Sequence, residues 1–302
     1  MTQPALQAAA SRYYDASPGV RVFRLGLAAA QRLGPALAVR AAYRLFATPL
    51  PLRLLRGRSA WDPRRWHIES WPFESTGLTL YSPADAPASS GMPTALLVHG
   101  WGGHAGQMRP LAEALMARGL RPVILEMPAH GRSAGSHSNL PQFARAIEYV
   151  GARLQQQGHS LRLGAAHSMG ANALAQAASR GLGAPRLVLL APPASPFEFT
   201  RVFAHVFGLR ESIRAAMQRR IEAREGILMA GFEPAAVGPR IGVPTLVVHD
   251  RGDSVNRFAD GEAFARAISD ARLVATEGLG HRKLLQDAHV LRQVAGFAVA
   301  GD

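Results

Sequence analysis

The sequence predicts an α/β fold with a mostly parallel central sheet and helices on both of its faces. From residue 94 onward, short apolar runs that suit buried strands alternate with amphipathic runs that suit helices. A crossover between parallel strands needs about the length of such a helix, and right-handed crossovers place helices on both faces of a sheet. One gap in this alternation is far longer than a crossover requires, which predicts an insertion.

The expected elements can be placed in chain order. The strands are residues 95–98, 122–126, 161–165, 187–191, 245–249 and 273–276, and the helices are residues 108–118, 141–156, 171–180, 258–268 and 288–298. Further upstream, residues 68–73 and 78–82 suit a hairpin around Thr76-Gly77. Two earlier helices are expected at residues 20–33 and 36–47, because Gly34-Pro35 separates them.

The chain, at 302 residues, is long enough for one large domain that carries an insertion. We assign residues 1–60 to a basic N-terminal helical extension, residues 61–192 and 243–302 to the α/β core, and residues 193–242 to a helical insertion. Two apolar stripes recur at helical spacing within the insertion. The first consists of Phe199, Val202, Phe203, Val206 and Phe207, and the second of Ile213, Met217 and Ile221.

Composition excludes several classes of protein. Although 48% of the residues are apolar, Arg and Gln interrupt every run that approaches the length of a membrane span. Residues 1–15 lack the features of a secretory signal, so we expect a cytoplasmic protein. Without cysteine there is no disulfide, thiolate metal site or cysteine nucleophile. Because no His-x-His-x-Asp or His-Glu-x-x-His spacing occurs, no metal is expected either.

The formal charge of +13 is concentrated near the N-terminus, where residues 1–60 hold nine Arg and one acidic residue. The α/β core is only mildly basic and lacks interleaved aromatic and basic residues, so we do not expect nucleic acid as a partner. Basic amphipathic helices can lie on an anionic membrane or dock on a partner. These arginines spread widely around the helices, which favours packing on the protein's own body over a peripheral membrane contact. The oligomeric state is not predicted.

The stretch around Ser168 suits a sharp turn from a strand into a helix. An apolar run ends in Ala166-His167-Ser168-Met169-Gly170, and an alanine-rich helical run follows. Such a turn crowds the positions two before and two after its tip, which therefore require small residues, here Ala166 and Gly170. Ser168 would stand at the tip, above the sheet and beside the N-terminus of the helix, where free N–H groups favour negative charge. Ser168 is therefore a candidate nucleophile.

Three further motifs follow predicted strands. The loop His99-Gly100-Trp101-Gly102-Gly103 comes after the first parallel strand, Asp253 comes after residues 243–249, and His281 comes after residues 273–276. The chain order is therefore nucleophile, acid and histidine. Each residue comes just beyond the carboxyl end of a predicted strand, which is where open parallel sheets place their sites. With these motifs, the sequence resembles the α/β-hydrolase family from roughly Thr94 to the C-terminus.

The resemblance implies a catalytic triad of Ser168, Asp253 and His281. Asp250 and Asp253 both lie in the loop Asp250-Arg251-Gly252-Asp253; the family pattern Gly-x-x-Asp favours Asp253, and Asp250 stays the alternative. The backbone N–H groups of Trp101 and Met169 would form the oxyanion hole. His99 and His130 would brace loops, and His167 would point away from the serine.

The family also implies a lid. An insertion at residues 193–242 would cover the nucleophile, with Phe199, Phe203 and Phe207 lining an apolar pocket for an acyl or alkyl group. Three positions depart from the family pattern: Glu126 replaces the usual Asp, and Ala129 and Ala166 replace the usual Gly.

The expected function is hydrolysis of a carboxylic ester or thioester by a serine hydrolase that needs no cofactor, acting on a small-molecule substrate. The same triad could serve an aminopeptidase or a carbon–carbon bond hydrolase. A peptidase would need an acidic anchor for the substrate amine, and the insertion offers Glu198, Glu211, Glu222 and Glu225. A binding protein on a hydrolase fold is a third hypothesis, although binding alone gives no reason to keep all three triad residues.

Overall fold

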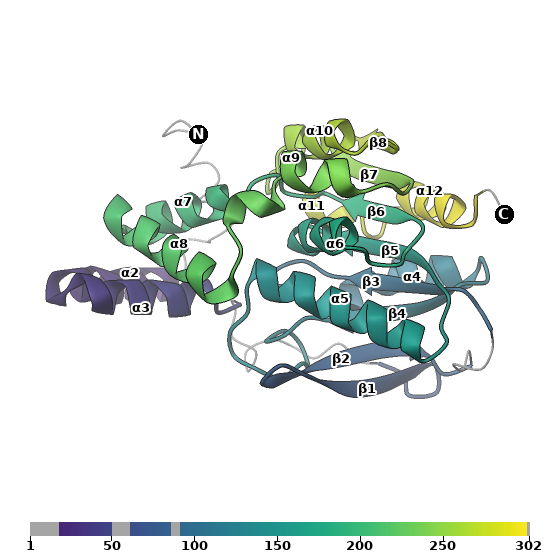
Figure 1. The fold of residues 1–302 in the computed structure, drawn as a ribbon, viewed down its shortest axis with the longest axis horizontal. Coiled ribbons are helices and arrows are strands. Elements are labelled where there is room, and N and C mark those ends of the chain that lie inside the picture. Colours follow the sequence, from purple (N-terminus) through teal and green to yellow (C-terminus); the bar gives the residue numbers. More distant parts are fainter. Residues whose placement is uncertain (1–17, 50–60, 86–90, 301–302) are drawn as a thin grey trace. The chain divides into compact units, whose positions relative to one another are not determined.

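A computed structural model describes residues 18–49, 61–85 and 91–300, which fall into two compact units (Figure 1). The core unit comprises residues 49–194 and 234–302, and the helical unit comprises residues up to 48 together with residues 195–233. The helical unit thus joins the N-terminal helices, which the sequence analysis treated as a separate extension, to most of the expected insertion. In the described part of the chain, no helix combines the length and apolar character needed to span a membrane.

The core unit is built on an eight-stranded sheet with the order β1-β2-β4-β3-β5-β6-β7-β8. Its strands are β1 (Trp66–Phe73), β2 (Thr76–Pro83), β3 (Thr94–Val98), β4 (Arg121–Glu126), β5 (Leu161–His167), β6 (Leu187–Leu190), β7 (Thr245–Asp250) and β8 (Ala271–Thr276). Strands β1, β2 and β4 pair antiparallel, and every pair from β4 to β8 is parallel. The predicted fold class, a mostly parallel sheet with helices on both faces, is confirmed.

Helices cover both faces of this sheet because side chains alternate between the faces along each strand (Figure 1). Helices α4 (Arg109–Met116) and α12 (Ala288–Val299) share one buried cluster with strand residues such as Leu97, Ala165 and Val248. The other face carries α5 (Leu140–Gln156), α6 (Met169–Ser179) and α10 (Phe258–Ala267). The short helix α11 (Gly280–Lys283), which carries His281, follows β8.

The hairpin between β1 and β2 turns two residues earlier than predicted. Phe73 pairs with Thr76, so Glu74 and Ser75 form the turn in place of Thr76-Gly77. Glu74 adopts a left-handed backbone conformation with φ 49°, which is unfavourable for a residue with a Cβ. Its carboxylate accepts hydrogen bonds from Gln142 Nε2 at 2.9 Å and Arg145 Nε at 2.7 Å, and these contacts offset part of that strain.

The helical unit consists of α2 (Pro18–Leu33), α3 (Pro35–Phe46), α7 (Pro196–Phe207) and α8 (Glu211–Glu225), followed by the short turn η4 (Met229–Phe232). Side chains from all four helices share one buried cluster, including Leu27, Tyr43 and Met217. Gln31 adds polar contacts: its Nε2 donates to the carbonyl of Gly208 at 3.1 Å, and its Oε1 accepts from the amide of Arg210 at 2.9 Å. The N-terminal helices therefore pack on the protein's own body.

Candidate functional site

The turn from β5 into α6 has the strained geometry that its sequence predicts. Ser168 has φ 55° and ψ −129°, a conformation that residues with a Cβ adopt only under constraint from their surroundings. A Cβ at Gly170 would lie 2.4 Å from the carbonyl oxygen of His99, so only glycine fits there. Because α6 begins at Met169, the hydroxyl of Ser168 stands at the N-terminus of a helix.

The structure brings Ser168, His281 and Asp253 into one hydrogen-bonded chain. His281 Nε2 lies 3.1 Å from Ser168 Oγ, and His281 Nδ1 lies 2.7 Å from Asp253 Oδ2. An ionised carboxylate only accepts hydrogen bonds, so Nδ1–H donates to it and Nε2 is left to accept from the hydroxyl. The three residues follow β5, β8 and β7, whose carboxyl ends lie at the same edge of the sheet.

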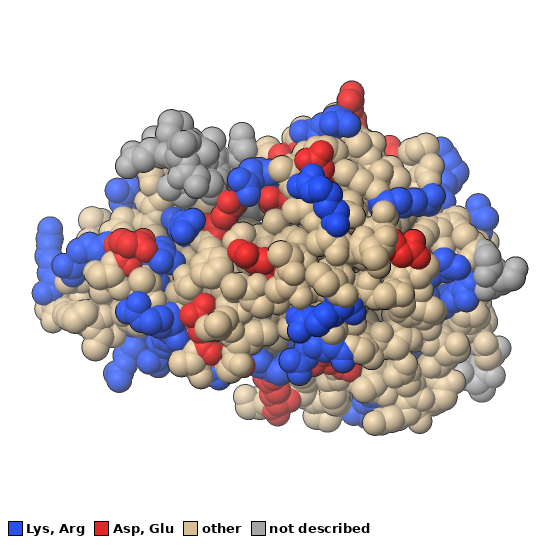
Figure 2. All heavy atoms as spheres, turned by 45° about the horizontal axis from the view of Figure 1, so that its top comes forward, with Lys and Arg blue, Asp and Glu red and all other residues tan. Residues whose placement is uncertain are grey.

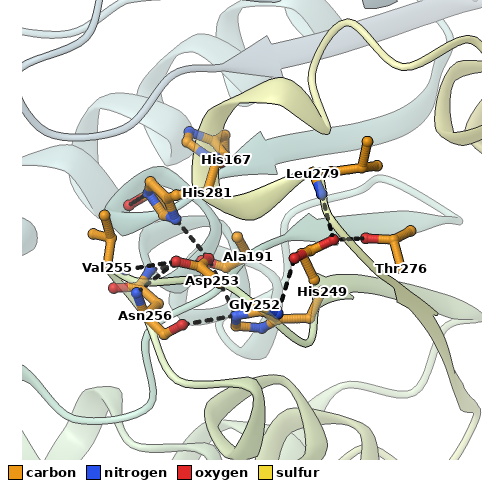
Figure 3. A network of polar contacts seen from close by, with 12 residues as sticks. His167, Ala191, His249, Gly252, Asp253, Val255, Asn256, Thr276, Leu279 and His281 are labelled. Atoms are coloured by element: carbon orange, nitrogen blue, oxygen red, sulfur yellow. Dashed lines mark hydrogen bonds and ion pairs between the residues drawn. The ribbon is translucent and has the colours of Figure 1, made fainter.

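Both oxygens of the Asp253 carboxylate are engaged (Figure 3). Oδ1 accepts from the amides of Val255 at 2.7 Å and Asn256 at 3.0 Å, while Oδ2 contacts His281 and, at 3.4 Å, His249 Nε2. Burial alone would raise the pKa of Asp253, but the hydrogen bonds from His249 and His281 outweigh it and hold the pKa well below its usual value. The carboxylate is therefore fixed in position and ionised.

His249 is a member of this network that the sequence analysis did not single out. It lies in β7 and is fully buried. Its Nε2 is also 3.2 Å from the carbonyl oxygen of Asn256, so Nε2 carries the proton and shares it between Asn256 and Asp253. The available signal was its place in the strand just before the acid loop, where a buried histidine needs a polar partner.

Asp250, the alternative acid, has a different set of partners. Its Oδ2 accepts from Thr276 Oγ1 at 2.8 Å and from the amide of Leu279 at 3.0 Å, and its Oδ1 accepts from the amide of Gly252 at 2.9 Å. Burial would raise the pKa of Asp250, but these hydrogen bonds lower it below the usual value. Asp250 thus anchors the segment that leads from β8 to His281.

His167, directly before the serine, contacts the histidine of the chain. Its ring centroid lies 4.6 Å from that of His281, and its Nε2 donates to the carbonyl oxygen of His281 at 2.9 Å. Burial, followed by the charge of His281, lowers the pKa of His167 to about 3. A neutral His167 therefore holds the backbone that carries His281.

The predicted oxyanion donors flank Ser168. A Cβ at Gly100 would lie only 2.7 Å from the Cβ of Ser168, so the loop that carries Trp101 passes directly beside the serine. Among the described residues, neither the amide of Trp101 nor that of Met169 donates a hydrogen bond. Both amides are thus available to an incoming oxygen.

His99 and His130 connect the two loops next to this site. The amide of Met127 donates to His99 Nε2 at 3.1 Å, and the amide of Gly102 donates to His130 Nε2 at 3.0 Å. Each bond joins the loop after β3 to the loop after β4. The two histidines therefore brace the backbone around the site, as the family resemblance implies.

Two of the departures from the family pattern have a structural explanation. The longer side chain of Glu126 accepts from Tyr81 Oη at 2.8 Å, the amide of Ala105 at 2.9 Å and the amide of Arg132 at 2.6 Å. Ala129 has φ 65°, which explains why glycine is favoured there. Both positions shape the loop after β4 without contacting Ser168.

The predicted acyl-pocket residues separate into two groups. Phe203 and Phe207 have no exposed surface, and their rings lie 4.7 Å apart in the core of the helical unit, where Phe46 contacts Phe203 at 5.2 Å. A side chain with no accessible surface cannot line an open pocket, so the assignment of these two residues to the acyl site is wrong. Phe199 is partly exposed, and its role stays a prediction.

Two comparisons relate the sequence to known proteins. The sequence profile of the family described as serine aminopeptidase, S33, matches residues 93–219, which include the loop after β3 and the turn at Ser168. A comparison with curated proteins gives no match.

Solved structures with the same fold are numerous. Est1E from Butyrivibrio proteoclasticus with ferulic acid bound has a TM-score of 0.61 at 20% identity, covering 76% of this chain and 96% of the other. The esterase Pf2001 from Pyrococcus furiosus has a TM-score of 0.60 at 18% identity, covering 83% and 96%. The thioesterase domain from the curacin biosynthetic pathway has a TM-score of 0.55 at 20% identity, covering 78% and 99%. The sheet order, the motifs and these comparisons together identify the chain as a protein of the α/β-hydrolase fold.

Proposed function

We propose that this protein is a serine hydrolase that cleaves carboxylic esters or thioesters through an acyl-enzyme intermediate. The observation that carries the proposal is the continuous chain from Ser168 Oγ through His281 to Asp253, with distances of 3.1 and 2.7 Å. A serine hydroxyl is a weak nucleophile at neutral pH, and this arrangement supplies the base that activates it.

The proposed mechanism has two halves. In the first, His281 Nε2 takes the proton of Ser168 as Oγ attacks the carbonyl carbon, and the amides of Trp101 and Met169 stabilise the oxyanion. His281 then gives the proton to the leaving alcohol or thiol, and the acyl group remains on Ser168. In the second half, His281 activates water, which releases the acid and restores the serine. Asp253 keeps the imidazole in the required tautomer and stabilises its charged form.

The choice of an ester or thioester rests on the comparisons. Among the similar structures, Pf2001 is titled an esterase, the curacin protein is titled a thioesterase domain, and Est1E has ferulic acid bound. At these identities the similarity supports the reaction class by analogy and leaves the substrate to experiment.

An aminopeptidase is the second candidate, because the matching family is described as serine aminopeptidase. Such an enzyme needs an acidic group for the substrate's amine, and two of the glutamates considered above have other partners. Glu211 pairs with Arg214 at 2.6 Å, and Glu222 accepts from the amide of Met229 at 3.0 Å. These contacts favour the esterase hypothesis.

The nucleophile can be tested with a fluorophosphonate probe, which reacts with activated serines. We expect the probe to label the full-length protein and to leave Ser168→Ala unlabelled, because the reactive oxygen is gone. Ser133→Ala is a matched control, since Ser133 is a buried serine of the same unit whose Oγ donates to the carbonyl of Glu126. Equal labelling of the parent and Ser168→Ala would reject Ser168 as the nucleophile.

The substrate class can be tested by measuring turnover with the full-length protein that has not been treated with the probe. We expect nitrophenyl acetate and longer nitrophenyl esters to be hydrolysed and aminoacyl nitroanilides to remain intact, in a spectrophotometric assay with Ser168→Ala as the blank. The opposite preference would support the aminopeptidase. Labelling without turnover of either class would direct attention to a carbon–carbon bond hydrolase.

A further inference from the structure

Helix α2 is apolar on two sides, and the described residues cover only one of them. Leu27 and Ala30 are buried in the core of the helical unit. A second stripe of Val22, Leu25, Gly26, Ala29 and Leu33 recurs at helical spacing, and every one of its residues is exposed. Val22, Leu25 and Leu33 expose 67%, 72% and 78% of their surface. Single exposed apolar residues are common on protein surfaces, but a continuous exposed stripe indicates a contact surface.

Arginines border this stripe. Arg21 precedes Leu25 by one helical turn and Arg32 follows it by two turns, so both lie in the row next to the stripe, and both are exposed. On α3, Leu37 is 47% exposed and shares a face with Arg40 and Arg44. Residues 18–48 contain five Arg and no Asp or Glu. Figure 2 shows Lys and Arg side chains gathered over the helical unit, at the left of the view.

The apolar stripe and its flanking arginines together indicate which kind of partner could bind this surface. A second copy of the chain would bring two purely basic faces together without an acidic partner, which is unfavourable. Nucleic acid would satisfy the guanidinium groups and leave the apolar stripe in water. An anionic lipid surface satisfies both, because apolar side chains enter the acyl boundary while arginines beside them reach the headgroup phosphates.

We propose that the exposed stripe of α2, with its flanking arginines on α2 and α3, docks the helical unit on the surface of an anionic membrane. The helix would lie in the plane of the interface, since its opposite side remains packed against α3 and α7. This docking is independent of the chemistry at Ser168.

Sedimentation with lipid vesicles tests the proposal on the full-length protein. We expect binding to vesicles of phosphatidylcholine and phosphatidylglycerol that weakens as salt is raised, and little binding to phosphatidylcholine alone. The variant Val22→Ser/Leu25→Ser/Leu33→Ser should bind anionic vesicles at least tenfold more weakly. Arg21→Gln/Arg32→Gln should also lose about tenfold, and only on anionic vesicles. The matched control is Leu228→Ser, because Leu228 is 66% exposed but lies outside the stripe.

The melting temperature and size of each variant complete the test. Because the replaced side chains are exposed, the triple variant should melt and elute like the parent. No binding to anionic vesicles by the parent, or equal binding by the triple variant, would overturn the proposal. A lower melting temperature of the triple variant, or a parent dimer that the substitutions convert to monomer, would also overturn it, since the stripe would then be covered by protein.

Discussion

Asp253 and Asp250 stand three residues apart in one loop and have different partners. Asp253 is surrounded by two backbone amides and two imidazoles, and Asp250 by two backbone amides and a hydroxyl. Only Asp253 contacts His281 directly. The Asp250 carboxylate instead fixes the backbone at Leu279, two residues before His281.

We therefore expect Asp253→Asn and Asp250→Asn to fail in different ways. Asp253→Asn should lower kcat/KM for a nitrophenyl ester by roughly 10⁴-fold, because the amide favours the wrong tautomer of His281. Asp250→Asn should lower the free energy of unfolding by about 1–3 kcal/mol, since buried donors lose a charged acceptor. Steady-state kinetics and thermal melts separate the two effects. A large kinetic loss in Asp250→Asn with parent-like activity in Asp253→Asn would make Asp250 the acid.

At the level of single elements, α7 belongs to the helical unit's core. Its apolar stripe faces α2, α3 and α8, with Phe203 in edge contact with Phe46. The helix also ends with a left-handed Gly208, whose carbonyl accepts from Gln31 of α2. A stripe of this kind specifies that a helix face is buried and does not specify which element buries it.

Phe203→Ala should therefore act on stability. We expect a loss of about 3–5 kcal/mol in the free energy of unfolding of the helical unit, because a fully buried ring leaves a cavity. Phe199→Ala, at a partly exposed position of the same helix, should cost much less. Thermal melts followed by far-ultraviolet circular dichroism measure both. If Phe203→Ala melted like the parent but lost its preference for longer nitrophenyl esters, the packing role would be contradicted.

At the level of the whole molecule, one buried histidine links stability of the core unit to pH. His167 keeps a pKa of about 3 when folded, against 6.5 for an ordinary histidine. Between pH 6.5 and pH 3 the imidazole of His167 is protonated in the unfolded chain and neutral in the folded chain. Its contribution to the free energy of unfolding is therefore complete above pH 6.5 and declines as the pH falls toward 3. At pH 5 the expected loss from this group is about 2 kcal/mol relative to neutral pH.

Urea unfolding at pH 7.5 and pH 5 measures this effect through tryptophan fluorescence, because Trp61, Trp66, Trp71 and Trp101 all lie in the core unit. The variant His167→Gln has no imidazole to protonate, so its free energy of unfolding should change less between the two pH values. Identical pH dependence in the parent and the variant would show that other groups dominate.

The sequence predicted most of the core unit because its signals are local. Strand and helix periods located the elements to within about two residues. The turn sequence indicated Ser168, and the resemblance to the α/β-hydrolase family implied Asp253 and His281; the structure brings the three residues together. The partner of each apolar face is a long-range property, so the joining of residues 18–46 to α7 and α8 was not predicted. His249 was missed because its role depends on the fold of the Asp253 loop.

The discontinuous helical unit has a consequence for the order of events during synthesis. Helices α2 and α3 leave the ribosome first, but their partner α8 ends only at Glu225, nearly 180 residues after Phe46. At a synthesis rate of about 5–20 residues per second, Leu27 and Tyr43 lack their native neighbours from α8 for on the order of 10–40 s. In that interval the apolar sides of α2 and α3 lack their native partners. The first strands of the core unit leave the ribosome during the same interval.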